Sequence, residues 1–283
     1  MYPTQFDYAR AGSVEEAISL GSADGAKFVA GGHSLIPAMK LRLSTPSTLV
    51  DIGRLSGLKG ISRNGNSVRV GALTTHAACA ASGDLPKVWS EAAGLIGDPQ
   101  VRNRGTVGGN IAHADPASDL PTVLTALRAN VNIQGAGGSR SVSADDFFVD
   151  LFTTALQEGE IITSVDVSAE GNRGSAYVKL FNPASRYAIV GVAVQVEVAG
   201  GVCKSASVAI GGCTNKATRA SGVEAALVGK TLDDATINAA AAAIASDLGD
   251  EVNGDMHASA EYRKAVAPGL VAQAIKTAVG RAK

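Results

Sequence analysis

Cysteine is scarce in this chain of 283 residues, and the three that are present lie far apart. They form no C-x-x-C pair, and none stands at a spacing from histidine that is typical of a metal site. Neither a disulfide framework nor an iron–sulfur cluster held by this chain alone is therefore indicated. We expect Cys79, Cys203 and Cys213 to be buried or half-buried free thiols in a reducing compartment.

An excess of charge of one sign is also missing, because 25 Lys and Arg nearly balance 26 Asp and Glu. Nucleic-acid binding usually needs clustered cations that displace counterions, so the balance disfavours that class. The chain does not open with a basic segment followed by an apolar one, and no apolar run approaches the ~18 residues of a membrane span. The sequence predicts a cytoplasmic location, with peripheral attachment to the inner face of the membrane left open.

The length and the 46% of hydrophobic residues suit two domains better than one. Composition shifts near residues 170–174, so we place the domains at 1–172 and 173–283. The first domain should mix helices and strands. The second should start with a β-meander, because valines at 192, 194, 196 and 198 alternate as in a half-buried strand. Three helices should follow, with Pro268-Gly269 kinking or splitting the last one.

Short elements are expected along the first domain. Ser13-Val14-Glu15-Glu16 fits a capping box, in which the Ser13 and Glu16 side chains satisfy each other's backbone amides. The segment 97–119 is rich in glycine and shows no periodicity. A loop of that length inside a compact domain is usually functional. The N-terminal segment is expected to be poor in strand, and residues 145–148 are expected to form a turn.

Two glycine-rich loops carry the chemistry, at 30–34 and 106–110. Glycines let backbone amides converge on an anion, and this pattern predicts a nest for phosphate oxygens. Ser34 and Thr106 add small hydroxyl donors, and neither loop contains lysine. Each loop alone is more often a simple turn than a ligand site.

Other nucleotide-binding patterns fail on spacing. The P-loop motif is absent, and Gly135-Ala136-Gly137-Gly138 lacks the glycine spacing of a dinucleotide-binding Rossmann unit. Two loops of similar chemistry, about seventy-five positions apart, favour one extended ligand clamped between them. No nucleophile–base set indicates a hydrolase.

At this point the motifs resemble a known family, the FAD-binding medium subunits of molybdenum hydroxylases. This family includes the carbon monoxide dehydrogenase medium subunit and is similar to the flavin domain of xanthine dehydrogenase. The first motif is AGGHSLIP at 30–37, followed by KLRL at 40–43. The second is the long run GDPQVRNRGTVGGN at 97–110, continued by AHADPASD at 112–119. The resemblance covers nearly the whole chain, including SAEYRK at 259–264.

The resemblance implies an α/β plus α+β fold. It consists of a two-subdomain FAD-binding domain of the vanillyl-alcohol oxidase or PCMH type (subdomains about 1–55 and 56–172) and a smaller α+β C-terminal domain. It further implies non-covalent FAD, a large molybdopterin-binding subunit and a small [2Fe-2S] subunit, assembled as a dimer of heterotrimers. The chain would be an oxidoreductase subunit that passes electrons from iron–sulfur clusters to an external acceptor such as quinone, NAD or oxygen. The substrate (carbon monoxide, an aldehyde, a purine or an N-heterocycle) would be chosen by another chain.

Residue by residue, the resemblance places the cofactor contacts as follows. The two loops hold the diphosphate and ribityl parts, Asp119 binds the ribityl or adenosine part, and Leu156 packs on the adenine side. Lys179 lies near the isoalloxazine, and Tyr187 covers one flavin face. No catalytic or metal-ligating residue is expected. The implied contacts are Ala30, Gly31, Gly32, His33, Ser34, Leu35, Thr106, Gly108, Gly109, Asn110, Asp119, Leu156, Lys179 and Tyr187.

Each of the last three polar assignments has a plainer alternative. Asp119 precedes a helix and could simply cap it. Lys179 stands in a strand, where an exposed lysine is the common case, although a cation near the flavin would stabilise its anionic reduced form. Tyr187, judged alone, is more often a core residue.

The remaining conspicuous side chains receive structural interpretations. A metal role for His33 and His113 is poorly supported, because no paired ligands stand at suitable spacing. His76 and His257 are expected to be surface or satisfied histidines, and Trp89 a packing residue.

The roles of two arginines, and three alternative functions for the chain, are left open by the sequence. Arg102 and Arg104 could meet a phosphate, solvent or a partner subunit. A non-catalytic flavin or nucleotide carrier, a stand-alone flavin reductase using NAD(P)H, and a purely structural subunit are the alternatives to the medium-subunit interpretation.

Overall fold

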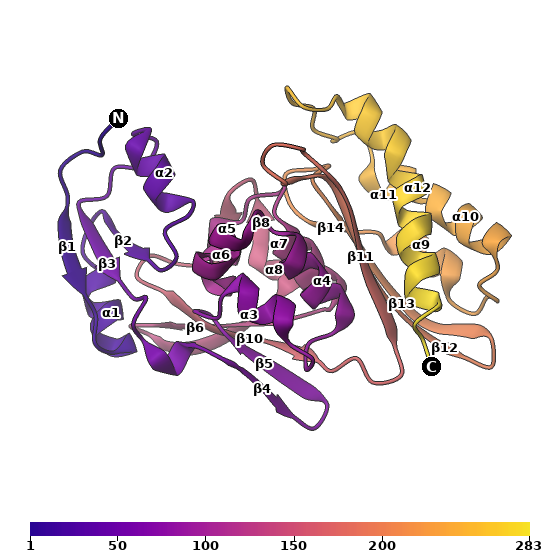
Figure 1. The fold of residues 1–283 in the computed structure, drawn as a ribbon, viewed down its shortest axis with the longest axis horizontal. Coiled ribbons are helices and arrows are strands. Elements are labelled where there is room, and N and C mark those ends of the chain that lie inside the picture. The colour runs from indigo at the N-terminus through magenta and orange to yellow at the C-terminus, as the bar shows by residue number, and fades with distance from the viewer.

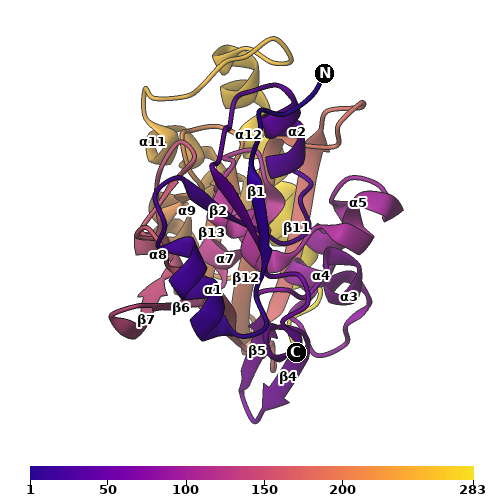
Figure 2. The same cartoon turned by 90° about the vertical axis from the view of Figure 1, so that its left-hand side faces the viewer.

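The computed structural model describes residues 1–283 as an elongated molecule with the N-terminal unit at one end and the C-terminal unit at the other (Figure 1). The first unit is a three-stranded parallel sheet in the order β1-β3-β2, with α1 packed against it. Its small core includes Ala17, Ile18 and Val50. Figure 2 views this unit from its own side. The elements are β1 (Asp7–Arg10), α1 (Val14–Gly21), β2 (Ala26–Val29), α2 (Leu35–Lys40) and β3 (Thr48–Asp51).

The second unit is an antiparallel sheet of five strands, in the order β4-β5-β10-β6-β7. A short hairpin, β8 with β9, stands apart from it. Trp89, Phe147 and Ile111 are fully buried in its core, which confirms the packing role expected for Trp89. The elements are η1 (Ser56–Leu58), β4 (Ile61–Asn64), β5 (Ser67–Gly71), β6 (Asn130–Gly135), β7 (Gly138–Ser143), β8 (Phe148–Asp150), β9 (Thr153–Thr154) and β10 (Ile161–Ser168).

Six helices accompany this second sheet, and residues 107–110 of the second glycine-rich segment form the start of α6. The helices are α3 (His76–Ala81), α4 (Lys87–Leu95), α5 (Pro99–Arg104), α6 (Val107–His113), α7 (Asp119–Ala126) and α8 (Ala144–Phe147).

The C-terminal unit is an antiparallel four-stranded meander covered by helices. Its elements are β11 (Gly174–Phe181), β12 (Ala188–Ala199), β13 (Val202–Gly211), β14 (Thr218–Arg219), α9 (Ser221–Leu227), α10 (Asp234–Ala242), α11 (Ile244–Leu248) and α12 (Ala260–Val279).

Both faces of this meander are buried, which goes beyond the half-buried strand that the valine alternation predicts. Val192 and Val194 face the C-terminal helices, whereas Ala193 and Ala209 belong to the core shared with the second unit. Helices α4 and α7 pack on that second face, and α12 packs on the first (Figure 1). The small residues matter because they let α7 approach the sheet closely.

Several local predictions were wrong. The segment 97–119 contains α5 and α6 rather than a continuous loop, because Asp98 and Thr106 cap two short helices that are too brief to show periodicity. The N-terminal segment, predicted to be poor in strand, forms β1, which pairs in parallel with β3. Residues 144–147 form the short helix α8.

The last helix is neither split nor interrupted at Pro268. Its buried side, which includes Ala267, Val271 and Ile275, lies on the meander. This packing holds the helix together across the amide that proline lacks.

The capping box at the start of α1 is confirmed only in part. The Ser13 hydroxyl accepts from the Glu16 amide at 3.1 Å, as predicted. The Glu16 carboxylate, however, accepts from the amide of Gly12 at 2.7 Å and not from that of Ser13. The three cysteines are free and buried, as expected.

Candidate cofactor site

The first glycine-rich loop presents a run of unused backbone donors between β2 and α2. The amides from Gly31 to Leu35 donate no hydrogen bond within the chain, either to backbone or to side chains. Gly32 has φ 75°, a left-handed conformation that turns the chain sharply here. Consecutive free amides in such a turn form a concave anion site. The loop therefore fits the phosphate-binding role that its sequence predicts.

The second loop lies directly against the first. A Cβ added at Gly31 would stand 2.3 Å from the carbonyl oxygen of Arg104 and 3.0 Å from the Cα of Gly105. Only glycine permits this approach of two backbones. The tertiary structure thus brings together two segments that lie in different predicted subdomains.

The two loops differ in a way that their sequences do not reveal. The amides of Val107 to Asn110 all donate inside the chain: to Thr74 O, to Ala72 O, and to the hydroxyl and carbonyl oxygens of Thr106. The expectation that both loops offer free amides is therefore wrong for these positions. The Thr106 hydroxyl, predicted as an added donor, accepts the Gly109 amide and caps α6.

What the second loop contributes is space and side chains. A Cβ at Gly108 would stand 2.7 Å from Ala72, so this glycine lets α6 lie on the end of β5. Gly109 is exposed, with only its own capping hydroxyl near a built Cβ. The Asn110 amide oxygen accepts from the Ser118 hydroxyl at 2.8 Å, which joins the loop to the start of α7.

Asp119 and Lys179 form a buried ion pair between the second and the C-terminal units. The ammonium Nζ lies 2.8 Å from Oδ2, and the two side chains are only 1% and 5% exposed. The Tyr177 hydroxyl donates to the other carboxylate oxygen. Burial raises the pKa of Asp119, and the Lys179 charge and Tyr177 hydroxyl oppose that rise. A Cβ at Gly191 would collide with the Tyr177 hydroxyl, so that glycine makes room for it.

The plainer alternatives for these two residues are wrong. Asp119 does not cap α7, because both of its oxygens are bound by side chains of β11. Lys179 is not an exposed strand lysine. Its ammonium also donates to the carbonyl oxygens of Leu95 at 3.0 Å and Arg186 at 2.7 Å, so all three of its donors are used by the chain.

Tyr187 lies at the end of a tight turn beside this ion pair. The turn is closed by the Asn182 amide, which donates to Tyr187 O at 2.9 Å, and Arg186 within it has φ 61°. The Tyr187 ring is 43% exposed, so it is not a core residue. Its pKa is raised by burial of the hydroxyl and by the charges of Asp115 and Asp119, and lowered by the Ser34 side chain.

Leu156 lies in another part of the second unit. It is half-buried and packs against the core of that unit, directly after the β8–β9 hairpin. The hairpin tip carries the exposed Phe152, whose ring centroid lies 5.1 Å from that of His113 at the end of α6. The arrangement connects the Leu156 segment with α6. His113 faces an aromatic ring rather than a second ligand.

His76 is the residue that the sequence interpretation placed wrongly. It is only 3% exposed, and its Nδ1 is a buried atom without a hydrogen-bond partner. The ring lies beneath the second loop, where a Cβ at Gly105 would stand 2.8 Å from its Cδ2. Burial and the charge of His33 lower the pKa of His76 to about 4. No sequence signal marked it, because the packing partner is a glycine 29 positions later.

Arg102 turns back on its own helix. Its guanidinium donates to the carbonyl oxygens of Ile96 and Gly97 at 3.0 and 3.1 Å, which stabilises the entry to α5. Arg104 is exposed, and its backbone carbonyl, rather than its side chain, meets the first loop.

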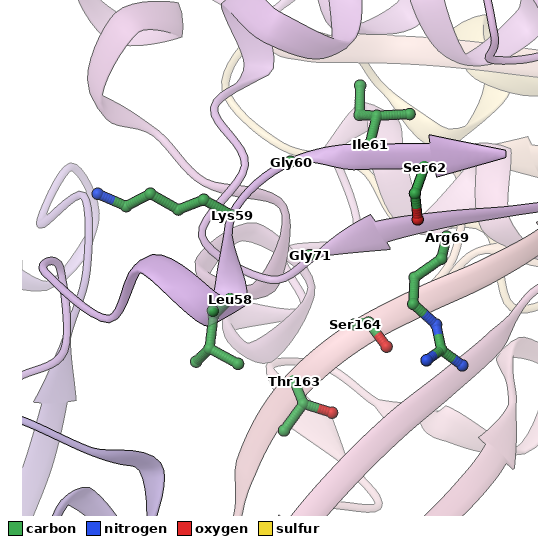
Figure 3. Close-up of a pocket in the computed structure, with 10 residues that line it drawn as sticks. Leu58, Lys59, Gly60, Ile61, Ser62, Arg69, Gly71, Thr163 and Ser164 are labelled. Atoms are coloured by element: carbon green, nitrogen blue, oxygen red, sulfur yellow. The ribbon is translucent and has the colours of Figure 1, made fainter.

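A separate polar hollow of about 310 Å³ opens at the edge of the five-stranded sheet (Figure 3). Leu58, Lys59, Ser62 and Thr163 are among its lining residues. Its guanidinium, from Arg69, is bound to Asp166 at 2.8 Å. None of the predicted cofactor contacts lines this hollow.

The residues present fit an FAD molecule held in the way the motifs predict. Five free amides and the open face of Gly109 provide an anion cradle. The ion pair and Tyr187 lie beyond it, at the junction with the C-terminal unit. None of the helices is long and apolar enough to cross a membrane.

Comparisons with known proteins agree with this geometry. The family described as "FAD binding domain in molybdopterin dehydrogenase" matches residues 4–168, and the "CO dehydrogenase flavoprotein C-terminal domain" matches residues 175–278. The chain is 40% identical to the glyceraldehyde dehydrogenase medium chain of Sulfolobus acidocaldarius, over 98% of this chain and 99% of that one. It is 38% identical to the carbon monoxide dehydrogenase medium chain of Hydrogenophaga pseudoflava, over 99% of both chains.

Solved structures extend the likeness to the whole fold. A chain of carbon monoxide dehydrogenase from Hydrogenophaga pseudoflava superposes with a TM-score of 0.95 at 39% identity, covering 100% of both chains. A chain of quinoline 2-oxidoreductase from Pseudomonas putida superposes with a TM-score of 0.92 at 30% identity, again over 100% of both. The chain therefore belongs to the family of FAD-binding medium subunits of molybdenum-containing dehydrogenases and hydroxylases.

Proposed function

We propose that this chain is the electron-exit subunit of a carbon monoxide dehydrogenase-like complex, with FAD held between its two glycine-rich loops. The observation that carries the proposal is the contact of Gly31 with Arg104 and Gly105, which places five free amides beside the second loop. Bound FAD would supply the redox chemistry, accepting electrons from a partner and delivering them to an external acceptor. The chain itself binds, orients and shields the cofactor.

Each predicted contact has a part in this arrangement. The amides between Ala30 and Leu35, which include those of Gly32, His33 and Ser34, bind the diphosphate. The second loop encloses it through Thr106, Gly108, Gly109 and Asn110. Leu156 packs on the adenine side.

At the other end of the cofactor, the Asp119–Lys179 pair and Tyr187 lie beside the ribityl chain and the isoalloxazine. Because all three donors of Lys179 are used by the chain, we infer that it acts on the flavin through its charge rather than through a direct hydrogen bond. Its Asp119 partner offsets part of that charge.

The finer points of the assembly belong to the same proposal. The chain would work with a large molybdopterin subunit and a small [2Fe-2S] subunit in a cytoplasmic dimer of heterotrimers. Its domains would be 1–172, of the vanillyl-alcohol oxidase or PCMH type, and 173–283. The first domain corresponds to the two sheets of the N-terminal and second units, and the second to the meander.

Replacement of Gly31 tests the site. Gly31→Ala places a methyl group 2.3 Å from Arg104 O, so the loops must separate and the purified chain should lose most of its FAD. The matched control is Gly57→Ala, since a Cβ there has no neighbour within 4 Å. Flavin content follows from the visible absorbance per mole of protein. A Gly31→Ala chain with full flavin content would refute the two-loop cradle.

Reduction experiments on the co-purified complex and on the isolated chain distinguish the alternative functions. Flavin reduction by carbon monoxide, an aldehyde, a purine or an N-heterocycle supports the medium-subunit function. Rapid bleaching of the isolated chain by NADH would instead indicate a stand-alone reductase. Flavin that the partner subunits never reduce would indicate a carrier.

A further inference from the structure

His76 supports the contact between the two loops from below. Its ring lies against Gly105, and Gly105 in turn lies against Gly31, so the imidazole and the two loops form three successive layers. The backbone reinforces this order. The His76 amide donates to Gly105 O at 3.1 Å, and the Val107 amide donates to Thr74 O at 3.0 Å. A shift of the ring is therefore transmitted directly to the floor of the phosphate cradle.

The surroundings of the ring accept it only in its neutral form. Nδ1 is buried without a partner, and the ring is 3% exposed. Protonation would add a charge and put an N–H on this buried Nδ1, which has no hydrogen-bond partner, and that is costly. The pKa of His76, lowered to about 4 by burial and by His33, agrees with this requirement.

The charged and titratable groups around the ring come from the first loop, from α3 and from the helices packed against it. His33 of the first loop faces the ring, with its own Nδ1 3.1 Å from Gly31 O. The other charged or titratable groups on α3 and on the helices packed against it are Cys79, Lys87, Glu91, Arg102 and Arg104. Among all of these, only His33 shifts the pKa of His76. Glu91, the one carboxylate among them, is paired with Arg281, so protonation of His76 has no carboxylate partner.

We propose that His76 is a positioning residue for FAD: the neutral ring holds Gly105 against Gly31, and its protonation separates the loops and releases the cofactor. This inference rests on the proposed two-loop FAD site. It adds a residue outside both motifs and gives cofactor retention a dependence on pH that the loops alone do not require.

The test measures FAD retained by the full chain after ultrafiltration, from neutral pH downward. In the unmodified chain, affinity should fall by up to about tenfold per pH unit between pH 6.5 and about 4. The neutral variant His76→Gln should lose most of this dependence while still binding FAD near neutral pH. His257→Gln, which replaces an exposed histidine far along the sequence, is the matched control and should behave like the unmodified chain.

A second variant keeps the test decisive if His76→Gln does not fold. His33→Gln removes a charge that disfavours protonated His76 in the closed loops, so the loss of affinity should end at a higher pH and be smaller overall. Far-ultraviolet circular dichroism is recorded in parallel, and release must precede unfolding. Equal pH profiles in all variants, or release only together with unfolding, would overturn the inference. A chain that binds no FAD even at neutral pH would instead overturn the proposed function.

Discussion

At the scale of single residues, glycine decides how closely the two loops approach each other. Gly31 lets one backbone touch another, and Gly108 lets a helix rest on the end of a strand. Both are cases in which a side chain is excluded by neighbouring backbone, which cannot move aside cheaply. Gly109 differs, because it is exposed and only the Thr106 hydroxyl lies within 4 Å of an added Cβ. The role of Gly109 is therefore tested by adding a charged side chain and comparing it with a neutral one of similar size.

Gly109→Asp should abolish FAD retention, whereas Gly109→Asn should reduce it only in part. The two side chains have nearly the same size and disturb the Thr106 hydroxyl equally, which stands 2.9 Å from a Cβ at this position. Only the aspartate brings a negative charge towards the phosphates. The measurement is flavin content of the two purified variants. Equal content in both would show that phosphate does not face Gly109.

At the scale of elements, α12 shows how packing overrides local propensity. Its ninth residue is Pro268, yet the helix is continuous over 20 residues. Proline inside a helix costs about 3 kcal/mol relative to alanine. The buried contacts of Ala267, Val271 and Ile275 with the meander offset that cost. The sequence predicted that Pro268-Gly269 kinks or splits this helix, and splitting is wrong because the contacts with the sheet could not be read from the sequence.

Pro268→Ala should raise the free energy of unfolding by about 1–3 kcal/mol, because it restores a helical hydrogen bond. Gly269→Ala is the companion change, with nothing within 4 Å of the added Cβ and an expected gain of about 1 kcal/mol. Urea unfolding followed by circular dichroism measures both. A loss of stability in Pro268→Ala would mean that the meander requires the local bend that proline imposes.

At the scale of the whole molecule, the Asp119–Lys179 pair connects the second unit to the C-terminal one. Lys179 belongs to β11, while its acceptors lie in α4, α7 and the Arg186 turn. Tyr177 and Ala193 extend the same junction into the apolar core. Because the pair is buried, removal of one partner leaves an uncompensated charge.

Lys179→Met should destabilise the chain by about 3–5 kcal/mol, since it leaves the buried Asp119 carboxylate without its ion-pair partner. The double variant Lys179→Met with Asp119→Asn should recover much of that loss. Urea unfolding of the unmodified chain, the two single variants and the double variant gives a double-mutant cycle. If the effects of the two single changes simply add, the two residues are not coupled. In holoprotein that survives, the flavin potential of Lys179→Met should be shifted. An unchanged potential would exclude an electrostatic role towards the flavin.

The sequence by itself determined the family, the order of its two parts and the two glycine-rich segments, because short glycine and capping motifs act locally. It placed Asp119, Lys179 and Tyr187 as candidates through resemblance alone. Only the tertiary structure decided that one loop offers free amides and the other does not. The amides of Val107 and Gly108 pair with Thr74 and Ala72 at a distant strand end, and those of Gly109 and Asn110 pair with Thr106. It also decided that Lys179 is buried and that His76 lies under the cradle. Such facts depend on contacts between segments far apart in the chain, which local pattern does not encode.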